Sequence, residues 1–335
     1  MNKIERVLAV LEGRQPDRPP ISFWHHFPLE CAAGPAAVEA HVRHVERYDL
    51  DFLKIMDDNR YPRIGLPDEM VCQAADLECL TVFRGDEGTF GQQLELIGQL
   101  SKRYAGQMLM ITTIFNAWTT LRLLMAPPAG KHGPPKLGGD VDPRDERMWQ
   151  LLRQSPTALA RALDTIATSL ANFCVRCLAA GADGIFLSVR DDWVDTPENG
   201  LGNYDALVRP ADLKILAGAE RAVFNMLHVC GQAVNFSRFA EYPVHAVNWA
   251  DRYAGPPLAA VATTMRPAIC GGLDNLGTLT SGTPEDCQRE VADAIRQVAP
   301  RPLIVAPGCT FDPDTVPAAN LDAVRRAVEI GAGGI

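Results

Sequence analysis

Short apolar segments without polar alternation recur along the chain, and most are followed by a helical pattern or a turn-rich loop. Strands that are apolar throughout are typical of a parallel sheet whose two faces are both covered, with helices as the crossovers. Repeated strand and helix units predict an α/β fold that closes into a barrel. The pattern predicts eight strands, over Pro20–Phe27, Phe52–Asp57, Leu109–Phe115, Gly184–Val189, Ala222–Val229, Ala246–Trp249, Ala268–Leu273 and Leu303–Ala306.

Two helices between these strands have recognisable boundaries. Thr283, Pro284 and Glu285 combine a capping residue, a proline in the first turn and an acidic first turn. A single long helix is predicted from about Pro143 to Ala180, because Gly follows it directly and ends it.

One Pro/Gly-rich segment, from Ala126 to Pro143, interrupts the alternation of strands and helices. We interpret it as a surface excursion or lid and not as a domain linker, because the β/α alternation resumes after it. The sequence therefore predicts one (β/α)8 TIM barrel over residues 1–335, with an N-terminal helical extension and a Pro/Gly-rich insertion.

Composition limits the classes of function. The chain has 335 residues, of which 47% are hydrophobic and 22% charged, which is ordinary for a globular protein with a large core. Its net charge of −9 argues against a nucleic-acid or anionic-membrane partner, because both require clustered Lys and Arg. The opening MNKIERVLAVLEGRQPDRPP has no uninterrupted apolar stretch, so we predict neither a signal peptide nor a membrane anchor and expect a cytoplasmic location.

The nine cysteines are scattered along the chain and odd in number, which argues against a disulfide framework and for reduced thiols. Cys174 and Cys177 form a CVRC sequence in the middle of a predicted helix. Three residues apart, they share one face of that helix, so packing accounts for them better than a second metal site. Cys270 and Cys287 likewise occupy core positions of a strand and a helix.

Three other side chains at strand ends have the chemistry of zinc ligands. His228 and Cys230, in FNMLHVCGQ, are two residues apart and therefore point to the same face of their strand. Cys309, in VAPGCTFDP, follows the last predicted strand and lies at the same rim of the barrel. Three ligands of nitrogen and sulfur leave one position open, as in catalytic zinc sites. The alternative is a hydrogen-bonded core histidine with two cysteines that pack as small apolar residues.

Further polar and aromatic residues follow other strands at this rim, where the chemistry of a β/α barrel is located. Arg190 is a candidate to bind an anionic substrate group, and a solvated loop is the alternative for it and its neighbours. The adjacent histidines after the first strand are equally compatible with simple solvation. The candidates for substrate binding or for orienting His228 are Trp24, His25, His26, Asn116, Trp118, Asp191, Asp192, Asn248, Asp251 and Asp274.

Several sequence blocks in combination resemble the uroporphyrinogen decarboxylase superfamily. The opening ERVLAVLEGRQPDRPPISF is similar to the family's first helix, Pro-Asp-Arg-Pro turn and first strand, and DFLKIMDD, TIFNAWTTLRLL and GADGIFLSV are similar to the next units. LHVCGQ, VNWADR, GGLDNLGTLTSGTPEDC and PGCTFDPDTVPAANLDAV complete the last four units in the expected order. The resemblance runs from the first helix to the end of the chain and implies the same barrel.

Two branches of this superfamily imply different activities. Porphyrinogen decarboxylases need no cofactor and carry an arginine-rich loop after the first strand, where this chain has ISFWHHFPLE. Without arginine there, the main clamp for a polyanionic tetrapyrrole is missing. The zinc methyltransferases that move methyl groups between corrinoid carriers and thiols such as coenzyme M have a His-x-Cys and a later Cys. His228, Cys230 and Cys309 match that pattern.

The resemblance thus implies a zinc-dependent methyl or alkyl transferase that activates a small thiol, with methylcobalamin or a corrinoid carrier protein as a possible donor or partner. The alternative is a cofactor-free decarboxylase or lyase, in which His228 and Asp58 do acid/base work; a third possibility is a protein that binds a corrinoid without turnover. Asp58 aligns with a catalytic aspartate of the decarboxylases, and Asp57 is the fallback. The sequence leaves open the methyl donor, the thiol, the fourth zinc ligand and whether the protein is a monomer or a homodimer.

Overall fold

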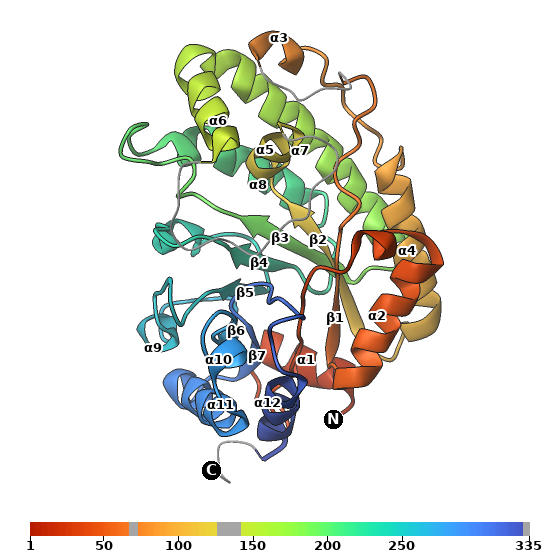
Figure 1. Cartoon of the computed structure of the whole chain (residues 1–335), viewed down its shortest axis with the longest axis vertical. Helices are drawn as coiled ribbons and strands as arrows, with labels where there is room; N and C mark the ends of the chain where they lie inside the picture. Colours follow the sequence, from red (N-terminus) through yellow and green to blue (C-terminus); the bar gives the residue numbers. More distant parts are fainter. Residues whose placement is uncertain (67–72, 126–141, 331–335) are drawn as a thin grey trace.

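The computed structural model describes residues 1–66, 73–125 and 142–330, and within them seven parallel strands form one sheet. Each strand pairs with the next along the chain, in the order β1 to β7. The sheet curls, and helices lie around its outside (Figure 1). The strands are β1 (Phe52–Ile55), β2 (Leu109–Phe115), β3 (Gly184–Val189), β4 (Met226–Val229), β5 (Ala246–Trp249), β6 (Ala268–Leu273) and β7 (Leu303–Pro307).

Helices connect these strands and also precede the first and follow the last. The α-helices are α1 (Lys3–Leu11), α2 (Gly34–Tyr48), α3 (Ala74–Leu77), α4 (Thr89–Tyr104), α5 (Ala117–Leu124), α6 (Pro143–Gln154), α7 (Pro156–Ala179), α8 (Arg209–Ala217), α9 (Leu258–Val261), α10 (Thr278–Ser281), α11 (Pro284–Val298) and α12 (Ala318–Ile330). Short 3-10 turns cover Leu29–Cys31 and Phe236–Phe239, and a π-turn covers Tyr204–Val208.

The predicted first strand, Pro20–Phe27, is not formed as a strand. Ile21 makes a single parallel bridge to Val305 of β7, and its carbonyl accepts a hydrogen bond of 2.9 Å from the Asp51 amide, just before β1. Pro20 has no N–H, which removes one ladder donor from this segment. The segment therefore lies between β7 and β1 where an eighth strand was expected, and the fold is consistent with a TIM-like barrel.

The prediction of one long helix from Pro143 to Ala180 is also wrong, because the segment forms two helices, α6 and α7. Ser155 separates them with φ −143° and ψ 50°, outside the helical region. The proline ring of Pro156 disfavours the helical conformation for the residue before it. Proline is favourable as the first residue of the second helix, so the break falls at Ser155. Most of the Pro/Gly-rich segment, residues 126–141, lies outside the described residues.

The start predicted for the helix after β6 is confirmed. α11 begins at Pro284, and the Thr283 side chain accepts a hydrogen bond of 3.2 Å from the Asp286 amide. The Asp286 carboxylate accepts one of 2.9 Å from the Thr283 amide in return. This reciprocal pair satisfies donors that the first turn of a helix cannot pair internally.

The buried residues form two clusters, one between the sheet and the outer helices and one inside the curled sheet. Phe52, Phe186 and Met226 belong to the inner cluster, and Val7 and Val10 of α1 pack against it. α1 precedes the strands and lies at their N-terminal end (Figure 1). The C-terminal ends of the strands are thus the end of the barrel that this helix leaves uncovered.

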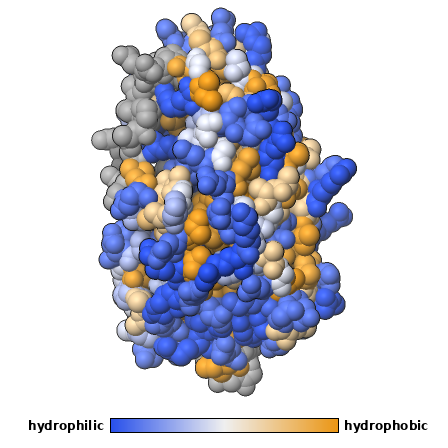
Figure 2. All heavy atoms as spheres, turned by 90° about the vertical axis from the view of Figure 1, so that its right-hand side faces the viewer, coloured by the Kyte–Doolittle hydropathy of each residue, from blue (hydrophilic) through white to orange (hydrophobic). Residues whose placement is uncertain are grey.

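No helix in the described part of the chain is long and apolar enough to cross a membrane. Most helices instead bury one side and expose the other, as their alternating buried and exposed residues show. The face in Figure 2 is accordingly largely hydrophilic, with hydrophobic patches between polar residues.

Candidate metal centre

His228, Cys230 and Cys309 come together at the C-terminal ends of the strands. His228 is in β4, Cys230 follows directly, and Cys309 comes two residues after β7. One ligand atom from each lies within 4.8 Å of the others. The strand ends of β4 and β7 meet because the curled sheet brings its C-terminal ends to one rim. The predicted ligands are therefore adjacent in space, although Cys309 follows Cys230 by 79 positions in the sequence.

Asn248 sets the orientation of the His228 ring. The two residues are register partners on β4 and β5, and His228 Nδ1 lies 2.6 Å from Asn248 Oδ1. The Asn248 amide nitrogen donates to the Cys270 and Pro307 carbonyls, at 3.1 Å each, so its oxygen must face the histidine. His228 Nδ1 then carries the proton, which leaves the Nε2 lone pair for a metal. Asn248 thus orients the histidine, as its position in the sequence suggested.

Two glycines allow the ligand loops to approach their neighbours. A Cβ on Gly308 would lie 2.7 Å from Ala250 Cα, so only glycine lets the residue before Cys309 pass so close to the chain after β5. Gly231, after Cys230, has φ +119°, and a Cβ there would lie 2.7 Å from an Asp192 carboxylate oxygen. Side chains at either position would displace a loop that carries a ligand.

The two proposed ligand cysteines differ in acidity. The Cys230 thiol donates a hydrogen bond to the Cys309 sulfur, which lowers the pKa of Cys309 to about 6. The same hydrogen bond, together with burial, holds the pKa of Cys230 well above its ordinary value. Cys309 is 8% exposed and His228 4%. The cluster is thus a set of soft ligands in which the Cys309 thiol loses its proton more readily than an ordinary thiol.

These residues fit a zinc ion. Zinc bonds to nitrogen and sulfur measure roughly 2.0–2.3 Å, so ligand atoms of one ion lie at most about 4.6 Å apart. Ligand atoms within 4.8 Å of one another need only small side-chain movements to meet that limit. They line a cavity of about 10 Å³, close to the volume that one water-sized sphere occupies. The donor set and the space therefore both suit a single ion.

Tyr253, which was not among the residues expected from the sequence, lines the same cavity. Burial and the nearby sulfurs of Cys309 and Cys230 raise the pKa of its phenol. Tyr253 follows β5 by four residues, in the loop that also carries Asp251. Its position after a strand was the available signal, but its orientation toward the sulfurs depends on contacts between loops.

Asp58 and His26 come together near this site. His26 Nδ1 lies 2.6 Å from Asp58 Oδ1, and the Phe27 amide donates to the other carboxylate oxygen at 3.3 Å. Burial acts to raise the pKa of Asp58, but the hydrogen bond from His26 acts in the opposite direction, and the pKa is lowered overall. Neither residue lines the metal cavity. His25 instead packs against His44, with ring centroids 5.0 Å apart, and burial lowers its pKa.

Asp57 points away from Asp58. Its charge acts on Cys177 of α7, on the outer side of the sheet. Burial raises the pKa of Asp57 to about 7. Successive residues of an extended chain point to opposite faces, so only one of the two aspartates can face the barrel mouth. The structure places Asp58 there, and it does not support Asp57 as a substitute.

The three polar residues after β3 are engaged with one another and with the loop after Cys230. Arg190 forms an ion pair with Asp192, whose carboxylate also accepts hydrogen bonds from the amides of residues 232 and 233. Asp191 accepts from the Asn235 amide at 3.1 Å and pairs with Arg238 at 3.0 Å. These contacts hold the loop that follows Cys230. Neither aspartate belongs to the cluster of described residues that could hold a metal ion.

Other predicted site residues have structural contacts instead. Asn116 caps α5 by accepting from the Thr119 amide, and Trp118 is fully buried in the outer core. Trp24 packs inside the sheet, 5.5 Å from the Phe186 ring. The structure does not bring these three to the metal cavity.

Two aspartates near β6 also accept hydrogen bonds from backbone amides. Asp251 accepts a hydrogen bond from the Gly272 amide at 2.9 Å, and burial raises its pKa to about 6. Asp274 accepts from the amides of residues 276 and 277, at 3.0 and 2.8 Å. Both therefore shape the loops around the site and do not face the ligands.

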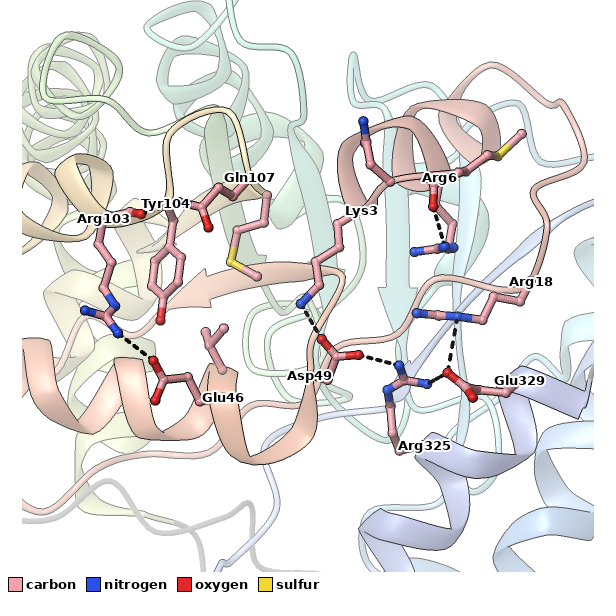
Figure 3. A pocket seen from close by; sticks show the side chains of 14 residues that line it. Lys3, Arg6, Arg18, Glu46, Asp49, Arg103, Tyr104, Gln107, Arg325 and Glu329 are labelled. Atoms are coloured by element: carbon pink, nitrogen blue, oxygen red, sulfur yellow. Dashed lines mark hydrogen bonds and ion pairs between the residues drawn. The ribbon is translucent and has the colours of Figure 1, made fainter.

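A larger hollow, of about 1010 Å³, lies at the opposite end of the barrel (Figure 3). Its charged residues pair with one another: Asp49 binds Lys3 and Arg325, each at 2.6 Å, and Glu46 binds Arg103 at 2.6 Å. Catalysis in β/α barrels takes place at the C-terminal ends of the strands. The small cavity at the cysteines is therefore the better candidate site.

Replacing Asn248 with alanine should weaken zinc binding about 10- to 100-fold, because the His228 ring loses the partner that sets its orientation and tautomer. Competition with a chromophoric chelator measures this affinity. Asn320 is a matched control: its buried amide donates to the Leu279 and Gly282 carbonyls, at 3.0 and 2.9 Å, and it contacts none of the proposed ligands. Asn320→Ala should lower stability without changing zinc affinity. Equal zinc affinity in both variants would contradict the role assigned to Asn248.

The sequence and the fold were compared with those of known proteins. The sequence profile of the family described as uroporphyrinogen decarboxylase (URO-D) matches residues 53–330. A methyltransferase from Methanosarcina mazei has the same fold, with a TM-score of 0.72 and 17% identity over 98% of each chain. A B12-independent methionine synthase from a Shewanella species aligns over 71% of this chain and 65% of its own, with 13% identity and a TM-score of 0.45. No curated protein matches significantly. The profile match covers most of the chain, and the protein therefore belongs to the uroporphyrinogen decarboxylase family.

Proposed function

We propose that this protein is a zinc-dependent methyl or alkyl transferase that uses a small thiol as acceptor. The observation that carries the proposal is the cluster of His228, Cys230 and Cys309 around a cavity of ion size. Three protein ligands leave a fourth position for substrate, as in catalytic zinc sites. When bound there, zinc would supply the charge that keeps a substrate sulfur deprotonated and nucleophilic near neutral pH.

The chain's own residues would prepare the site for this chemistry. The Cys230 and Cys309 sulfurs offset the charge of the metal, and Asn248 holds His228 with Nε2 free. His228 and Cys309 are largely buried, which would limit the access of water and strengthen the electrostatic interactions there. The donor that we propose is a methyl group on a corrinoid, free or on a carrier protein, or a similar electrophilic carbon.

The segment after Ile21 supports this reading over porphyrinogen decarboxylation. Residues 21–30, ISFWHHFPLE, contain no arginine, and the histidines there bind Asp58 or pack against aromatic rings. A substrate with many carboxylates requires several fixed cations. Residues 21–30 supply no arginine to bind such carboxylates.

A second candidate function is a cofactor-free lyase with another substrate. The paired His26 and Asp58, 2.6 Å apart and largely buried, favour it, because such a pair can exchange a proton with a substrate. In that case the cysteines would only pack, and activity would not depend on metal.

Metal analysis and a transfer assay test the proposal. Protein purified without chelator should carry one zinc ion per chain, and it should move the methyl group of methylcobalamin to 2-mercaptoethanol, which the cobalamin absorbance reports. Dialysis against a chelator should abolish transfer, and added zinc should restore it. A metal-free protein that retains full catalytic activity would overturn the proposal in favour of the lyase.

A further inference from the structure

Lys54 is a buried lysine inside the curled sheet. It lies on β1 between Phe52 and Met56, whose side chains belong to the inner cluster, and it is 4% exposed. Its Nζ lies 4.3 Å from the centre of the Phe186 ring and 3.0 Å from the Met56 sulfur. An aromatic face and a thioether are weak partners for an ammonium group. The side chain thus points into the barrel without a strong partner.

Lys54 differs in this from the other buried cations. Among the lysines and arginines that the structure describes as buried, Arg6 and Arg122 each contact an aspartate at 2.7 Å or less. No carboxylate oxygen of the described residues lies within 4.0 Å of the Lys54 ammonium. An unpaired buried charge is costly, and its position inside a functional barrel therefore requires a reason.

The charges that act on Lys54 belong to the candidate site. Burial lowers the pKa of Lys54 to about 7, and the negative charges of Cys309 and Asp58 act in the opposite direction. The Phe186 ring, on which the ammonium lies, stacks on His228 with centroids 5.2 Å apart. Lys54 and the proposed ligand His228 therefore both contact the Phe186 ring, while Asp58 is already paired with His26.

A charge count shows what this cation can do. Zinc with two cysteine thiolates and a neutral histidine has no net charge, and a substrate thiolate in the fourth position brings the group to −1. In a buried site that extra charge is unfavourable unless a cation lies nearby. A neutral fourth ligand, such as water or imidazole, adds no charge and needs no compensation.

We propose that Lys54 is the positioning residue that supplies the counter-charge for an anionic fourth ligand at the metal centre. The inference rests on the proposed function. A thiol that bound in the open position would lose its proton to solvent, and the Lys54 ammonium would balance the negative charge that remains. Lys54 acts through the field at the metal ligands and does not bind the substrate directly.

Cobalt-substituted protein provides a test that does not depend on catalytic activity. Cobalt(II) absorbs in the visible range, and its spectrum changes when a fourth ligand binds. We would titrate wild type, Lys54→Met and Lys54→Arg with 2-mercaptoethanol, azide and imidazole. Lys54→Met should bind the thiol and azide about 10-fold more weakly or worse, with imidazole affinity unchanged. Lys54→Arg should restore most of the anion affinity, because it keeps the charge.

The controls separate this role from a structural one. Lys54→Met removes an unpaired buried charge, so its Tm should not fall, and Lys54→Gln should behave like it as a second uncharged variant. Equal anion affinity in wild type and both uncharged variants would overturn the inference, as would loss of cobalt binding in both. If wild type takes azide and imidazole but no thiol, the proposed thiol chemistry fails, and the azide comparison still decides the role of Lys54.

Discussion

Replacing Cys309 with alanine is expected to abolish stoichiometric zinc binding and, with it, transfer to a thiol. Only His228 and Cys230 then remain to hold the ion, and the more acidic thiol of the pair is the one removed. Loss of a partner behind a ligand already weakens metal binding by about 10- to 100-fold, so loss of a ligand itself should exceed about 100-fold. Zinc content after gel filtration and affinity by chelator competition measure the effect.

Cys174 gives this experiment its control. It is a fully buried cysteine of α7, and burial raises its pKa to about 12, so it behaves as a small apolar side chain. Cys174→Ala should lose some stability while keeping zinc and activity. A Cys309→Ala protein that retains one zinc per chain, or that loses zinc without losing activity, would contradict the proposed site.

Replacing Asp51 with alanine is expected to be the most destabilising substitution at the N-terminal end of the strands. Its carboxylate is fully buried and binds Arg6 and Arg18, each at 2.7 Å, and also accepts from the Ile21 amide at 2.8 Å. Removing it leaves two arginines without their shared partner and frees the segment that bridges to β7. Breaking a buried pair in this way costs about 3–5 kcal/mol. Urea unfolding measures the change in the free energy of unfolding.

The matched control is an exposed ion pair. Asp322 binds Arg47 at 2.7 and 2.8 Å with similar geometry, but both side chains are open to solvent. Asp322→Ala should leave the unfolding midpoint nearly unchanged, because solvent screens such pairs. If the two alanine variants lose the same stability, Asp51 does not hold the first segment in the barrel.

The sequence predicted the repeated features of this fold well. Seven of the eight predicted strands are formed, with ends that differ by a few residues, because a strand buried on both faces leaves a local apolar signature. The predicted start of α11 is correct because a cap involves residues three apart. The two errors concern prolines, at Pro20 and Pro156, whose effect on pairing and on helix continuity was underestimated.

For the proposed site, the sequence by itself indicated which residues could hold a metal and at which end of the strands they lie. Side-chain type and the alternation of a strand were sufficient for His228, Cys230 and Cys309. Only the tertiary structure decided which residues support them: Asn248 through its register with His228, Tyr253 through a loop contact, and Lys54 through its place inside the sheet. These contacts join segments that are distant in sequence. They depend on the curl and the register of the sheet, which leave no pattern within any one segment.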